Sequence, residues 1–120
     1  MAFLLSVFSV NSALADFEAG VEASRTGDRA TAFKEIQAAA MEGDNRAYGK
    51  LASMYLYGLG TAKNYHQAYV WFQMADLAGE YEAERYHNTV LSLRTQEEFD
   101  RAVQAAENQR IELGLPDMPE

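Results

Sequence analysis

Few residues of this chain have the types and spacing that catalysis needs. The two histidines, His66 and His87, fall in different predicted helices, and the chain has no cysteine, which excludes thiolate zinc sites, thiol nucleophiles and disulfides. Glu84 precedes His87 by three positions, and this spacing places both on one helix face, as in di-iron bundles. Such a site needs a second E-x-x-H and two further carboxylates, and the sequence has no second copy. We interpret both histidines as solvated or packing side chains and expect no metal and no cofactor.

The remaining candidate motifs have structural explanations. Glu80, Glu82 and Glu84 alternate at the start of a predicted helix, where acidic side chains suit the helix dipole. The glycines of Gly58-Leu59-Gly60 lack the third glycine of a dinucleotide turn and the Gly-Lys-Ser/Thr ending of a phosphate loop. No S-x-x-K motif of β-lactam chemistry is present. The sequence therefore predicts a protein without a catalytic site.

Charge and hydropathy narrow the classes of partner. The 120 residues carry a formal net charge of −8, and the pI is near 4.7. This charge argues against nucleic acid, whose phosphates select Lys and Arg, and against an anionic membrane surface. It would favour a basic protein or peptide partner, although acidic balance is also a common means of solubility. No stretch reaches the ~20 apolar residues that span a bilayer, so no transmembrane segment is expected in the mature chain.

The N-terminal segment 1–15 has the features of a secretory signal peptide. It is uncharged, contains a short apolar block, and ends in an Ala-Leu-Ala pattern that predicts cleavage after Ala15. Its lack of a basic residue leaves open a native start upstream of Met1, and a first core helix of the repeat domain is the alternative. Export would place the protein in the periplasm of a bacterium or outside the cell. We expect one repeat domain over residues 16–114 and an acidic tail over 115–120.

Helix-favouring residues, separated by glycines and capping residues, predict an all-α domain. Asp28, Asp44 and Asn64 are expected to cap helices, and Thr95 with Glu98 forms a T-x-x-E capping box. The expected helices, taken in three pairs, span residues 16–25, 29–42, 45–57, 65–78, 80–93 and 96–113.

Two stretches carry the same residue pattern thirty-six positions apart. The positions of the first are Ala32, Ile36, Gln37, Ala39, Gly43 and Ala47, and those of the second are Ala68, Phe72, Gln73, Ala75, Gly79 and Ala83. A fixed period of 20–50 residues is typical of stacked repeat proteins. We therefore predict a short α-solenoid of about three antiparallel helix pairs, in which the alanines sit where paired helices cross.

The segment between Ala47 and Ala83 resembles the Sel1-like repeat, a family related to the tetratricopeptide repeat. The family pattern reads A-x-x-x-L-(A/G)-x-x-Y-x-x-G-x-G, a loop, and then A-x-x-W-(F/Y)-x-x-A-A-x-x-G-x-x-x-A. The positions that match inside the segment are Leu51, Tyr55, Gly58, Gly60, Ala68, Trp71, Phe72, Ala75 and Gly79. The first helix pair is closer to a tetratricopeptide repeat, and the third keeps only the apolar spacing. The resemblance implies an α-solenoid that mediates protein–protein contact, often as an adaptor in bacterial envelope or signalling complexes.

By analogy with related solenoids, the first helix of each pair is expected to line a concave face. The residues predicted to bind a partner there are Glu18, Glu22, Arg25, Tyr48, Met54 and Tyr57. Aromatic, Met and Arg side chains are common interface anchors, but core packing is an open alternative for Met54 and Tyr57. The predicted function is a non-enzymatic scaffold that holds a protein or peptide.

Two other functions stay open on the sequence alone. One is a small periplasmic hydrolase built on the same scaffold, and the other is a structural subunit of an envelope complex. Self-association through a repeat edge is also compatible with the pattern, because the ends of a solenoid expose stackable surface.

Overall fold

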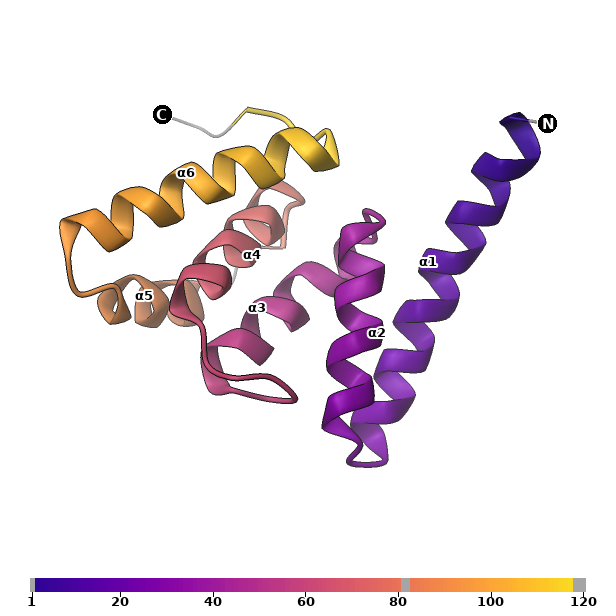
Figure 1. Ribbon diagram of the computed structural model, residues 1–120, viewed down its shortest axis with the longest axis horizontal. Helices are drawn as coiled ribbons and strands as arrows, with labels where there is room; N and C mark the ends of the chain where they lie inside the picture. Colours follow the sequence, from indigo (N-terminus) through magenta and orange to yellow (C-terminus); the bar gives the residue numbers. More distant parts are fainter. Residues whose placement is uncertain (1, 81–82, 118–120) are drawn as a thin grey trace.

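The computed structural model describes residues 2–80 and 83–117, with no description of the side chains of 2–13 and 83. Within these residues the chain forms six α-helices and no β-strand, which confirms the all-α prediction (Figure 1). The elements are α1 (Ala2–Arg25), α2 (Arg29–Met41), a 3-10 turn (Asn45–Ala47), α3 (Tyr48–Tyr57), α4 (Tyr65–Leu77), α5 (Ala83–Ser92) and α6 (Gln96–Leu113). None of these helices combines the length and apolar content needed to cross a membrane.

Helix α1 begins earlier than expected. The sequence predicts a helix start near Asp16, whereas the backbone is already helical at Ala2 and stays so through Ala15 to Arg25. Met1 and the side chains up to residue 13 lie outside the described part, so the signal peptide and its cleavage point stay a prediction. Of the predicted acidic tail, residues 118–120 also lie outside it.

The helix ends are set by the residues that the sequence marks. Asp28 and Asn64 accept hydrogen bonds from the backbone N–H groups of Thr31 and Gln67, at 3.2 and 3.1 Å. Thr95 forms the predicted capping box. These caps confirm the expected start of three helices, because each satisfies a backbone donor that the first helical turn leaves free.

Helices α2 and α4 end in the same way, thirty-six residues apart. Gly43 and Gly79 adopt left-handed φ angles of 91° and 85°, which an L side chain rarely adopts. The next N–H then bonds back to the carbonyl oxygen five residues earlier, Asp44 to Ala39 at 3.0 Å and Glu80 to Ala75 at 2.8 Å. This is the Schellman ending of a helix, and it turns the chain sharply towards the next element.

The first four helices pack as two pairs. Helix α1 lies along α2, and α3 lies along α4 (Figure 1). The expected third pair is different, because α6 packs mainly along α4 rather than along α5. The ring of Tyr69 on α4 contacts both of the following helices: it meets Phe99 of α6 and Tyr86 of α5, with centroids 5.6 Å apart in both cases. Helix α4 is thus the centre of the second half of the chain.

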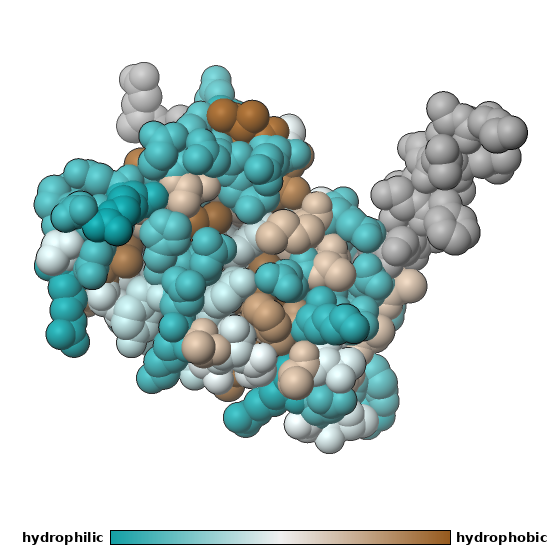
Figure 2. Space-filling model, in the orientation of Figure 1, coloured by the Kyte–Doolittle hydropathy of each residue, from teal (hydrophilic) through white to brown (hydrophobic). Residues whose placement is uncertain are grey.

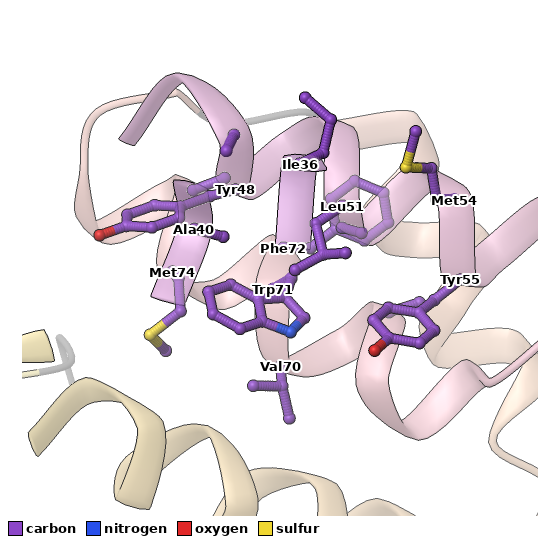
Figure 3. Close-up of a cluster of buried hydrophobic side chains, with 14 of the residues drawn as sticks. Ile36, Ala40, Tyr48, Leu51, Met54, Tyr55, Val70, Trp71, Phe72 and Met74 are labelled. Atoms are coloured by element: carbon purple, nitrogen blue, oxygen red, sulfur yellow. The ribbon is translucent and has the colours of Figure 1, made fainter. Parts of the chain in front are cut away.

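The core lies where α3 and α4 meet α2. Trp71 and Leu51 are fully buried, and Ile36 and Phe72 are nearly so (Figure 3). The buried residues of α4 cover most of its circumference, which is typical of a helix that lies between neighbours on both sides. Alanines with no exposed surface sit between the large side chains and let the helices approach closely; they are Ala39, Ala40, Ala47, Ala52, Ala68, Ala75, Ala102 and Ala106. Polar side chains cover much of the face seen in Figure 2.

The two related stretches also make related contacts. Gln37 donates a hydrogen bond from Nε2 to the hydroxyl of Tyr55 at 3.3 Å, and Gln73 donates to the hydroxyl of Tyr86 at 2.7 Å. Phe33, one turn before Gln37, meets the ring of Tyr55 edge to face at 5.4 Å. In both stretches, therefore, an aromatic residue and a glutamine bind a tyrosine of the helix that follows.

Candidate functional site

Four of the six predicted partner-binding residues lie at the surface. Glu18, Glu22 and Arg25 are exposed and share one face of α1, at spacings of four and three residues. Tyr57 closes α3 with 47% of its surface exposed, so the alternative of core packing does not hold for this residue. An exposed tyrosine offers contact area at a small entropic cost and is a common interface anchor.

The expected exposure of Tyr48 is wrong, and for Met54 the alternative of core packing holds. Tyr48 is 1% exposed and Met54 8% exposed. The ring of Tyr48 packs against Trp71, with centroids 5.7 Å apart, and burial raises the pKa of its hydroxyl. Tyr48 begins an apolar stripe that continues through Leu51 and Tyr55, so the helical period could have placed it in the core.

Met54 instead lines a small cavity between three elements. The cavity measures about 190 Å³ and lies between the end of α1, the start of α2 and the end of α3. Its other lining residues are Ser24, Arg29, Ala32 and Leu59. Ala32, Met54 and Leu59 give it an apolar lining, to which Arg29 and Ser24 add polar groups. The sequence indicated Met54 but missed Ser24, Arg29 and Leu59, because their role depends on how the loop after α3 folds back.

Gly60 explains how the loop after α3 folds back onto the start of α2. Its φ is +76°, and a Cβ atom at this position would lie 2.1 Å from the carbonyl oxygen of Arg29. Only glycine allows the loop to touch the start of α2 so closely. Two backbone bonds hold the loop, from the N–H of Leu59 to the Met54 oxygen and from that of Asn64 to the Tyr55 oxygen, both 2.9 Å long. The loop thereby brings Leu59 to the cavity.

Glu18 and Glu22, the acidic residues on the exposed face of α1, already have arginine partners. Arg25 bonds Glu22 at 2.7 Å and lowers the pKa of that carboxyl. Glu18 lies 3.4 Å from Arg46, whose guanidinium also stacks 4.0 Å above the ring of Phe17. These exposed ion pairs are individually weak, so a cationic side chain of a partner could replace either arginine at little cost.

The two histidines lie on different helices. Glu84 and His87 are both exposed on α5, and His66 lies half-buried at the start of α4. Among the described residues, no group of three or more His, Asp or Glu side chains is close enough to hold a metal ion. The di-iron arrangement that the E-x-x-H spacing could belong to is therefore not assembled within this part of the chain.

Comparisons with protein-family models, with curated proteins and with solved structures found no match to this chain. The resemblance to the Sel1-like repeat consequently rests on the residues of the sequence and stays a prediction.

Proposed function

We propose that this protein is a non-enzymatic interaction module, a short α-solenoid of Sel1-like type that holds a protein or peptide partner on the face formed by α1 and α3. One observation carries the proposal. Tyr57 is exposed on α3, three residues after Met54, which lines the cavity between α1, α2 and α3. Residues three apart lie on the same side of a helix, so Tyr57 offers an aromatic anchor on the side of α3 that carries Met54, and exposed aromatic residues are frequent interface anchors.

The matched contacts of the two related stretches support the repeat character of the proposal. Ala32 and Ala68 are buried equally well, and Ile36 and Phe72 fill corresponding core positions. Gln37 and Gln73 each bind a tyrosine hydroxyl of a neighbouring helix. Stacked units that bury equivalent positions in this way present successive helices side by side, and such scaffolds bind extended partners.

Charge indicates the partner's chemistry. Glu18 and Glu22 are exposed on α1 and bound only through weak surface ion pairs. With a net charge of −8 on the whole chain, the partner that fits best is a basic peptide or a protein with a basic surface. We propose that the protein binds this partner in the periplasm or outside the cell, after cleavage near Ala15.

The test begins with a partner captured by crosslinking the mature protein in its native compartment. Its affinity is then compared for the wild-type protein and two matched variants. Tyr57→Ala should weaken binding by roughly tenfold or more, because it removes the proposed anchor. Tyr65→Ala removes a tyrosine of similar exposure outside the proposed face and should leave the affinity unchanged.

Salt dependence tests the charge part separately. Binding to a basic partner should weaken as the ionic strength rises, since the surface charges are screened. Equal affinities of the two tyrosine variants would refute the proposed face. An affinity that does not change with ionic strength would refute a basic partner.

A further inference from the structure

A second cavity lies in the other half of the chain. It measures about 300 Å³ and lies between the start of α4, the end of α5 and the first turn of α6. The side chains that line it are mainly polar: Lys63, Asn64, Tyr65, His66, Ser92, Leu93 and Glu98. It shares no residue with the cavity at Met54, and nothing in the proposed partner binding uses it.

Two opposite charges line this cavity without binding each other. Lys63 and Glu98 are both exposed, and none of the ion pairs within the described residues joins them. Because the two charges do not neutralise each other, each can still bind an oppositely charged group of a ligand in the cavity.

The carboxylate of Glu98 is held in a fixed position. Its Oε2 atom accepts bonds from the backbone N–H groups of Arg94 at 2.8 Å and Thr95 at 3.3 Å, while the N–H of Glu98 bonds the Thr95 hydroxyl at 3.0 Å. No donor from the described residues bonds Oε1 of the same carboxylate. The capping box thus orients the Glu98 carboxylate, whose Oε1 atom can still accept a hydrogen bond from a charged donor.

We propose that this cavity binds a small zwitterion, namely a free α-amino acid or a dipeptide. The ligand's ammonium group bonds Oε1 of Glu98, and its carboxylate bonds the ammonium group of Lys63. A ligand with one charge gains one of these contacts and is repelled by the other residue, so a ligand with both charges is favoured. The volume lies at the lower end of small-molecule sites, and Leu93 supplies an apolar contact for a short side chain.

Four ligands test the charge requirement on the unmodified protein. L-alanine and L-alanyl-L-alanine carry both charges and distinguish the two sources of the zwitterion. N-acetyl-L-alanine lacks the ammonium, and L-alaninamide lacks the carboxylate. An NMR titration should show saturable shifts of residues around the cavity with at least one zwitterion, and at least tenfold weaker binding of both blocked compounds, since each loses a charge-assisted hydrogen bond.

Matched variants test the residues. Glu98→Gln removes the charge but keeps the capping box, because Gln serves at that position as Glu does. Glu112→Gln removes an exposed charge of the same helix outside the cavity. Zwitterion binding should weaken about tenfold in Glu98→Gln and in Lys63→Gln, and stay unchanged in Glu112→Gln. The proposal is overturned if neither zwitterion binds at millimolar concentration, if a blocked compound binds as well, or if Glu98→Gln and Glu112→Gln behave alike.

Discussion

The rings of Tyr48 and Trp71 join α3 to α4, with centroids 5.7 Å apart and planes tilted by 37°. Both side chains are buried, and Trp71 has no exposed surface at all. The indole N–H of Trp71 has no acceptor among the described residues. This pair therefore contributes packing rather than hydrogen bonding, and the α3–α4 unit depends on it.

Replacing Trp71 tests that dependence. Trp71→Ala should lower the free energy of unfolding by about 3–5 kcal/mol, because it leaves a large cavity beside Tyr48. Trp71→Phe should cost clearly less, since it keeps a ring and removes a buried donor that has no partner. Urea unfolding of both variants provides the comparison. Equal losses would show that the size of the ring is not what holds the two helices together.

Replacing Gly60 should destabilise the protein far more than replacing Gly27. Both residues have left-handed φ angles, +76° and +85°, but an added Cβ would collide with the Arg29 carbonyl only at Gly60. We expect Gly27→Ala to cost about 1 kcal/mol for its backbone conformation alone, and Gly60→Ala to cost several times more. Thermal unfolding measures both. A Gly60→Ala variant as stable as Gly27→Ala would contradict the close approach of the loop to α2.

Ala75 tests the tight crossing of helices. It has no exposed surface, so Ala75→Leu should destabilise the protein by about 1–3 kcal/mol through overpacking. Ala30→Leu places the same side chain on the exposed side of α2 and should change stability by less than about 0.5 kcal/mol. Denaturant midpoints of the two variants should differ accordingly, and similar midpoints would mean that the space around Ala75 is not filled.

The ion pair of Asp44 and Arg46 gives a dependence on pH. Arg46 hydrogen-bonds the Asp44 carboxylate at 2.7 Å and lowers its pKa below the ordinary 3.8. A lowered pKa means that the folded state favours the ionised form, so the stabilisation is complete above about pH 4 and is lost as the pH falls through the lowered value. Asp44→Asn should therefore be less stable than wild type near neutral pH. The gap should narrow below pH 3, as unfolding curves at both pH values would reveal, whereas a gap that does not change with pH would contradict a contribution from the ionised carboxylate.

Local signals in the sequence predicted most of the helices. Glycines and capping residues mark chain conformations that depend on neighbouring residues only, so Gly43, Gly79 and the Thr95 box could be recognised directly. The start of α1 was not predicted, because the Ser and Asn residues of segment 1–15 are poor helix formers and the helix propensity of a residue is a weak guide.

The arrangement of the helices was harder to predict. Periodicity tells which face of a helix is apolar, but not which neighbour covers it, so the packing of α6 on α4 could not be anticipated. Tyr48 was assigned to a surface from its place in a repeat, although its own apolar stripe points into the core. Residues from three separate elements line each cavity, and the sequence cannot show that these elements come together.

The most direct test of the proposed function is crosslinking from two defined positions. A photoreactive amino acid replaces either Tyr57 or Ile111, an exposed residue of α6, and the protein is irradiated in its native compartment. We predict one protein or peptide adduct from position 57 that is absent from position 111 and that is lost when free basic peptide is added in excess. No adduct from position 57, or the same adducts from both positions, would contradict a partner-binding face on α1 and α3.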